Sequence, residues 1–171
     1  NLVSANVTAA ISDNAIITAR AIEMLSVNRV EKPVLAGGVT ENLKGTTGGL
    51  ASAAGATDTT TIHVTTKIRV GNGAQMTILG TNANEHSFSL SARNEYNVHD
   101  KVAFVTGGAV SGAMAFAGIS VPTAVAAVEI GVGAVLTTTD AIDISARGAG
   151  ELSQEVFAET YGAGTATVGS A

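Results

Sequence analysis

The strongest constraint on the fold is an internal repeat, in which three segments follow one pattern. The segments align on Ala15, Ala74 and Ala134, with spacings of 59 and 60 positions. A large apolar residue lies four positions before each alanine and another lies two positions after it, and a threonine follows at the third position. Turn-forming residues precede each alanine: Ser12-Asp13-Asn14, Gly71-Asn72-Gly73 and Gly131-Val132-Gly133. Each segment therefore predicts a strand, a tight turn and a second strand.

A second landmark follows in each copy, at Leu25-Ser26, Leu90-Ser91-Ala92-Arg93 and Ile144-Ser145-Ala146-Arg147. A third strand is expected to start near Val34, Val102 or Val156, and glycines follow it at Gly37-Gly38, Gly107-Gly108 and Gly162. The first copy is the most divergent, and the second carries an insertion at 81–87. We place the repeats at 1–59, 60–119 and 120–171 within one domain, and expect the last to be incomplete and the segment to come from a longer array.

The composition of the chain favours strands that pack without large side chains. Hydrophobic residues make up 46% of the chain and aromatic residues 4%, and there is no cysteine. Together with the repeat, this predicts an all-β fold, a parallel β-helix (β-solenoid) whose stacked coils pair through the backbone. We expect each repeat to divide into three turns of about 20 residues, giving about eight coils and a rod about 40 Å long. The structural alternative is a β-sandwich-like filament subunit.

Two stretches could be mistaken for helices. The stretch 12–27 has helical apolar spacing, but its counterparts in the other copies contain glycines that a helix interior disfavours. The stretch 102–128 has no charged residue and is long enough to span a membrane. Its side chains alternate, however, with Val110, Met114 and Phe116 on one parity and alanines on the other. Period two predicts a strand with no membrane span.

The repeated blocks resemble the repeat arrays of large bacterial filamentous adhesins, the filamentous-haemagglutinin-like and leukotoxin-type families. The blocks that carry the resemblance are Val70-Gly71-Asn72-Gly73-Ala74 with Thr77, Gly107-Gly108-Ala109-Val110-Ser111-Gly112, Gly133-Ala134-Val135-Leu136-Thr137-Thr138-Thr139 and Ile142-Asp143-Ile144-Ser145-Ala146. The first copy and the insertion at 82–86 depart from it. The resemblance implies a β-helical stalk displayed outside the cell, with adhesive or scaffolding work and no catalytic residues.

The sequence has no residue pattern that predicts a catalytic or metal site. The three histidines, His63, His86 and His99, lack metal-ligand spacing. The acidic residues Glu151, Glu155 and Glu159 share one strand parity and suggest a solvated face. The pair Asp140 and Asp143 could be a glycosidase pair, but it lies in a turn-like part of the repeat.

The glycine and threonine runs do not predict a binding site either. The glycine runs at 45–49, 107–108 and 162–169 lack the lysine of a phosphate-binding loop. The threonine runs at 59–61, 65–66 and 137–139 do not recur at every coil, as an ice-binding array would require.

These observations predict a non-enzymatic structural segment of a bacterial surface adhesin or extracellular filament, with no catalytic, cofactor or metal site. The net charge of −5 argues against nucleic-acid binding. The expected partners are neighbouring copies or repeats of the same protein, together with an unidentified host or cell-surface receptor. The alternative is a pilus-like fibre subunit that polymerises by donating a strand such as 1–10. A carbohydrate-active β-helix enzyme using Asp140 and Asp143 is a weaker third hypothesis.

Overall fold

The computed structural model describes residues 1–33, 42–79, 88–139 and 141–171. These residues form strands and turns with no helix, so the protein is all-β. Both stretches that could have been helical consist of strands and the turns between them. The strands are β1 (Leu2–Ile11), β2 (Ile16–Ala19), β3 (Ile22–Lys32), β4 (Leu43–Gly48), β5 (Ala51–Val70), β6 (Gln75–Ile78), β7 (Phe88–Gly107), β8 (Val110–Ile130), β9 (Val135–Thr137), β10 (Ile142–Tyr161) and β11 (Gly164–Ser170).

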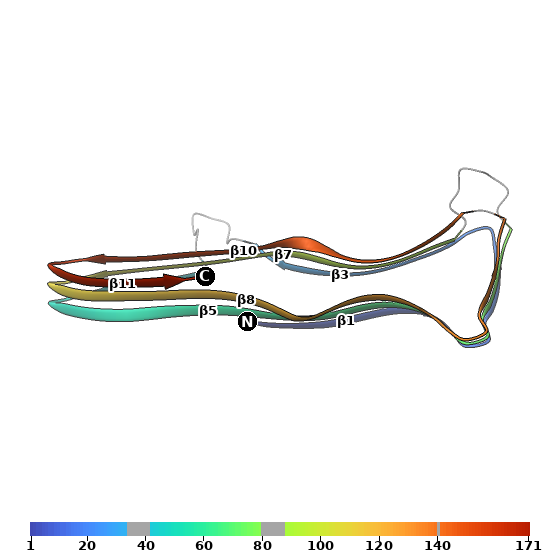
Figure 1. The fold of residues 1–171 in the computed structure, drawn as a ribbon, viewed down its shortest axis with the longest axis horizontal. Coiled ribbons are helices and arrows are strands. Elements are labelled where there is room, and N and C mark those ends of the chain that lie inside the picture. The colour runs from blue at the N-terminus through green and yellow to red at the C-terminus, as the bar shows by residue number, and fades with distance from the viewer. Residues whose placement is uncertain (34–41, 80–87, 140) are drawn as a thin grey trace.

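The strands form three parallel sheets through which the chain passes in turn. Sheet A has the order β1-β5-β8-β11, sheet B the order β2-β6-β9, and sheet C the order β10-β7-β3, with β4 also paired to β7. Figure 1 shows the long strands of sheets A and C running alongside each other, joined by a tight turn at one end of the molecule and by the short strands at the other. We call each passage a layer: β1 to β4 form layer 1, β5 to β7 layer 2, and β8 to β10 layer 3.

The register stacks residues about 60 positions apart. Ile17 pairs with Met76 and Met76 with Leu136, while Thr18, Thr77 and Thr137 form the neighbouring column. Ala15, Ala74 and Ala134 precede these strands and pack in one core cluster. One complete repeat is thus a single layer, and the expected division of each repeat into three coils is wrong.

The segments that were expected to form whole coils are individual long strands. Strands β5, β7 and β10 are each 20 residues long, and β8 has 21 residues. The longest axis of the molecule follows these strands (Figure 1). The layers therefore stack across the long axis, and the molecule is wide in the direction of its strands.

Layer 1 is interrupted where layers 2 and 3 are continuous. Strand β3 ends with Lys32 opposite Val98, and β4 resumes with Leu43 opposite Val102. Between these two pairs, layer 1 has ten residues and layer 2 has three. Because of the extra residues, the glycine that pairs with Gly107 is Gly48. The expected match of Gly37-Gly38 to Gly107-Gly108 is therefore wrong. Val34, Gly37 and Gly38 lie outside the described residues.

The second landmark of layer 1 is also displaced by one residue. Met24, and not the predicted Leu25, pairs with Leu90, which in turn pairs with Ile144. The burial agrees, because Leu90 is buried while Leu25 is exposed. A shift of one residue moves a side chain to the other face of a strand. The predicted match of Leu25-Ser26 to Leu90-Ser91 is therefore wrong, whereas the match of Val102 to Val156 is confirmed. No third strand starts at these two valines, because they lie inside the continuous strands β7 and β10.

The interior between sheets A and C holds three apolar clusters separated by polar side chains. The first cluster lies beside sheet B and includes Ile68, Val70, Met76, Phe88 and Leu90. The second lies midway and is built from Val30, Ile62, Val64 and Val98. The third lies near the tight turn and packs Val102 and Phe104 against Ala113, Ala115 and Ala117.

Strand β8 confirms the predicted alternation of large and small side chains. Its alanines face the interior, where Ala115 is fully buried, while Val110 and Met114 are 63% and 49% exposed. The small inward side chains leave room for Phe104 across the interior. The described residues contain no helix long and apolar enough to cross a membrane.

Candidate functional site

The residues singled out as possible ligands or catalysts are dispersed over the outer surface. His63 contacts the Thr123 hydroxyl through Nδ1 at 3.3 Å, on the outside of sheet A. His99 contacts the Asn97 side-chain oxygen through Nε2 at 2.8 Å, on the outside of sheet C. His86 lies outside the described residues. Within the described part of the chain, no group of three histidines or acids is placed to hold a metal ion.

The acidic residues of β10 lie at alternate positions on its outward-facing side. Glu155 pairs with Lys101 of the adjacent layer at 2.9 Å. A hydrogen bond with Glu159 raises the pKa of Tyr161 above its ordinary value. Glu151 is exposed. These residues form a solvated edge, and the structure does not bring them together around one point.

The proposed carboxylate pair is not assembled by the described residues. Asp143 is exposed on β10, opposite Ser89 of β7, and Asp140 lies outside the described residues. In the third threonine run, Thr137 pairs with Thr77 of layer 2. The first run, Thr59-Thr60-Thr61, faces Gly118, Ile119 and Ser120 of β8. Threonine does not continue across the sheet there, so the run makes no flat threonine array.

Outward ion pairs connect neighbouring layers. Arg29 of layer 1 donates two hydrogen bonds to one oxygen of Glu95 in layer 2, at 2.9 and 2.7 Å. Lys67 of layer 2 donates to Glu129 of layer 3 at 2.6 Å. The hydrogen bond and charge of Lys67 lower the pKa of Glu129. Because these groups are exposed, each pair contributes little to the free energy of folding.

The molecule also has a charged cluster inside, which the sequence pattern did not reveal. Lys32, at the end of β3, faces the interior and reaches from layer 1 to two aspartates of layer 2. Its Nζ donates hydrogen bonds to Asp58 Oδ2 at 2.9 Å, to Thr60 Oγ1 at 2.9 Å and to Asp100 Oδ1. Thr60 Oγ1 also donates to Asp100 Oδ1 at 3.3 Å. We call these four residues the Lys32 cluster.

The Lys32 cluster lies between the second and third apolar clusters. The side chain of Asp100 is 0% exposed, that of Asp58 13% and that of Lys32 21%. Asp100 stands between Val98 and Val102, which are both fully buried. Its second oxygen, Oδ2, is buried and accepts no hydrogen bond from the residues that the structure describes. A buried carboxylate oxygen without a partner is costly.

The electrostatics of the cluster favour an ion pair. Partial burial lowers the pKa of Lys32, but hydrogen bonds and attraction to Asp100 and Asp58 outweigh that effect, and the pKa of Lys32 lies above its ordinary value of 10.5. The residues of the cluster are far apart in sequence, with Lys32 and Asp100 separated by 68 positions. One signal in the sequence could have predicted the cluster: Asp100 and Lys32 are charged residues at strand positions whose parity places them among inward-facing side chains.

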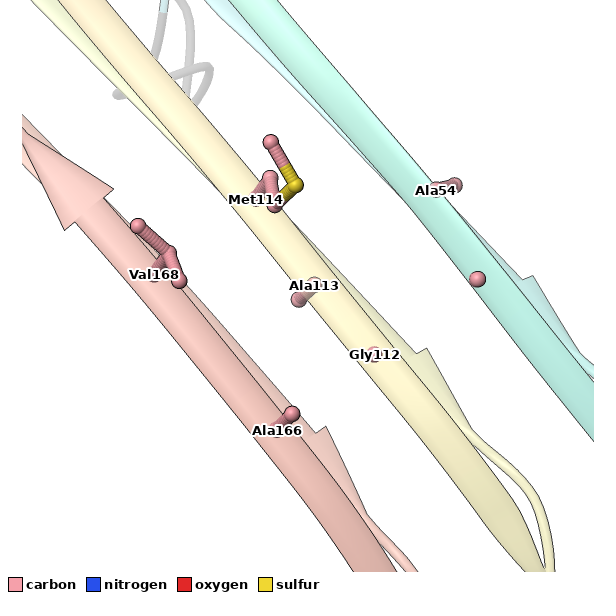
Figure 2. Close-up of a pocket in the computed structure, with 7 residues that line it drawn as sticks. Ala54, Gly112, Ala113, Met114, Ala166 and Val168 are labelled. Atoms are coloured by element: carbon pink, nitrogen blue, oxygen red, sulfur yellow. The ribbon is translucent and has the colours of Figure 1, made fainter.

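A recess with apolar walls lies at sheet A. It has a volume of about 360 Å³ and is lined by residues of β5, β8 and β11: Ala53, Ala54, Gly112, Ala113, Met114, Ala166 and Val168. Figure 2 shows Met114 and Val168 on neighbouring strands, with small residues on either side. The recess offers no titratable group, so it provides a surface without acid–base chemistry.

A comparison with known proteins finds no matching family model, no similar curated protein and no similar solved structure.

Proposed function

We propose that the chain is a non-enzymatic β-solenoid segment of an exported surface adhesin or extracellular filament. The parallel register carries this proposal: residues from 54 to 66 positions apart pair in all three sheets. Such stacking lets every layer support the next, as in repeat proteins whose stability comes from nearest-neighbour interfaces. The repeat blocks described above, which resemble those of filamentous adhesins, support the assignment to the cell surface.

The proposed work is mechanical, and the partners are neighbouring layers of the same kind. Inward side chains of layer 3 are half-exposed where their equivalents in layer 2 are covered. Ile144 is 45% exposed while its partner Leu90 is 0% exposed, and Leu152 is 48% exposed while its partner Val98 is 0% exposed. Another layer stacked on β10 would bury this apolar edge and pair its free backbone groups.

Concentration-dependent association tests this proposal. Sedimentation velocity of the chain should show reversible growth into rods, with the rod axis across the strands in electron micrographs. The double variant Ile144→Lys and Leu152→Lys should remain monomeric because it places charges on the apolar edge. The matched control Met114→Lys changes an exposed residue on the outer face of sheet A and should still associate. A wild-type chain that stays monomeric over a wide concentration range would contradict the proposal.

Strand donation is the competing mechanism of polymerisation. Its candidate donor, 1–10, includes most of β1, which pairs with β5 of its own chain over ten residues. That pairing supports stacking of layers over donation of β1. Deletion of residues 1–10 distinguishes the two, because a donor-strand polymer would fall to monomers whereas a stack of layers would lose only part of one layer.

A further inference from the structure

The Lys32 cluster brings together the groups of a condensation reaction. A lysine amine from β3, the carboxylate it contacts on β7 and a second carboxylate on β5 meet between sheets A and C. The Asp58 carboxylate contacts Nζ at 2.9 Å and can take protons from it. Asp100 Oδ1 accepts hydrogen bonds from Lys32 Nζ and Thr60 Oγ1, whereas Oδ2 accepts none from the described residues.

We propose that Lys32 and Asp100 become joined by an isopeptide bond between Nζ and Cγ, with Asp58 as the proton-transferring carboxylate. Asp58 accepts a proton from the Lys32 ammonium, and the free amine attacks Cγ of Asp100. Asp58 then returns that proton, and relays a second one from Nζ, to the carboxylate oxygen that leaves. The C–N bond forms, one C–O bond breaks, and one water molecule departs. The ammonium supplies both hydrogens of that water, so no co-reactant is needed.

The ion pair brings the two reacting groups into contact, and its surroundings promote the reaction between them. Holding the amine against the carboxylate converts a reaction between two molecules into one within the fold, which is the source of high effective concentration. The Asp100 side chain is fully buried between Val98 and Val102, which limits the access of water to Cγ. Thr60 Oγ1 hydrogen-bonds both Nζ and Asp100 Oδ1 and positions the two reacting groups.

The bond would tie layer 1 to layer 2 at the point where layer 1 is interrupted. Lys32 is the last residue of β3, and Asp100 lies on β7, its partner strand. Without a covalent link, strand pairing and the hydrogen bonds of the Lys32 side chain hold the end of β3 at this position. A covalent link there would prevent β3 from peeling away from β7 under load. This inference concerns a modification of the chain itself, and its test does not depend on whether the protein is a surface adhesin.

The intact mass of the purified chain, measured after prolonged incubation in the folded state, tests the proposal. We expect the mass to be lower than the sequence mass by one water molecule. Tryptic digestion should give one joined peptide that links the segment containing Lys32 to the segment containing Asp100. The full sequence mass would overturn the proposal. A loss of water without the joined peptide would also overturn it, because an aspartate side chain can lose water by forming a ring with its own backbone amide.

Variants separate the roles of the three residues. Asp58→Asn keeps Lys32 beside Asp100 but removes the proton acceptor, and should retain the full sequence mass of that variant. Lys32→Met and Asp100→Ala should also show no loss of water. The matched control Lys67→Met breaks the exposed pair with Glu129 and should still lose one water. Formation of the joined peptide in Asp58→Asn at the wild-type rate would overturn the role of Asp58.

Discussion

At the scale of single residues, the turn before sheet B depends on one backbone conformation repeated in each layer. Asn14, Gly73 and Gly133 have φ values of 55°, 64° and 72°. This left-handed region is costly for residues with a Cβ atom, and asparagine tolerates it better than most. The sequence satisfies the requirement with asparagine in layer 1 and glycine in layers 2 and 3.

The shared conformation of Asn14, Gly73 and Gly133 predicts different effects for two substitutions at Gly133. A Cβ added there meets no atom closer than 4.0 Å, so any cost comes from the backbone conformation alone. Gly133→Ala should lower the free energy of unfolding by about 1–2 kcal/mol, whereas Gly133→Asn should lower it by less, because Asn14 already occupies the equivalent place. Chemical denaturation of both variants measures the difference. Equal losses would contradict the conformational explanation.

At the scale of the strand, the two faces of β8 have opposite requirements. Inward alanines pack against Val102 and Phe104, and outward residues such as Met114 meet solvent. Along 110–117 the larger side chains of β8 therefore lie on its solvent-facing side, whereas farther along the strand Ile119, Val121 and Val128 pack inward. A core that contains alanine at this density has no spare volume for longer side chains.

The faces of β8 can be compared by exchanging side chains of adjacent residues. Ala115→Met inserts a long side chain at a fully buried position and should destabilise the protein by about 1–3 kcal/mol. Met114→Ala removes a side chain that is 49% exposed and should change the stability by less than about 0.5 kcal/mol. Thermal and urea unfolding of the two variants measure both effects. A larger loss for Met114→Ala would reverse the assignment of the faces.

The strand scale also shows where prediction from the sequence succeeds and fails. The columns at Ala15, Ala74 and Ala134 were predictable because turn residues and apolar residues recur at fixed offsets. The size of a layer was not predictable, because β5, β7 and β10 are several times longer than an ordinary strand. A segment of that length is long enough to form a whole coil of a common solenoid, with its own turns, and nothing in the local pattern separates the two outcomes.

Layer 1 and the Lys32 cluster escaped prediction for a related reason. The register of layer 1 depends on where its extra residues between β3 and β4 are placed, and the copies alone do not locate that interruption. The contact between Lys32 and Asp100 depends on which positions face inward on strands from different layers. No local pattern encodes such a contact, since it exists only after the layers stack.

At the scale of the whole molecule, one layer is the unit that can be added. Duplication of the segment 71–130 repeats one passage through the three sheets and joins Ile130 to Gly71, the same kind of junction as Val70 to Gly71. An added layer buries more surface between neighbours, so the denaturation midpoint should rise. The strand content per residue, measured by circular dichroism, should be unchanged.

The control for this experiment is a duplication shorter by one residue. Duplicating 71–129 shifts the following strands by one position and turns their inward side chains outward. That variant should be less stable than the variant carrying 71–130, and should not exceed the original chain. Equal stability of the two duplications would show that register between layers does not determine stability.

The large circumference of each layer also sets how far such a chain can extend. Each layer adds only one strand spacing, about 4.8 Å, to the height of the stack. A stalk of about 100 Å would need roughly 21 layers at that spacing, and so roughly 1,250 residues. A tall stack therefore requires a very long polypeptide chain. Each added layer also widens the side surface of the stack, on which neighbouring molecules can bind.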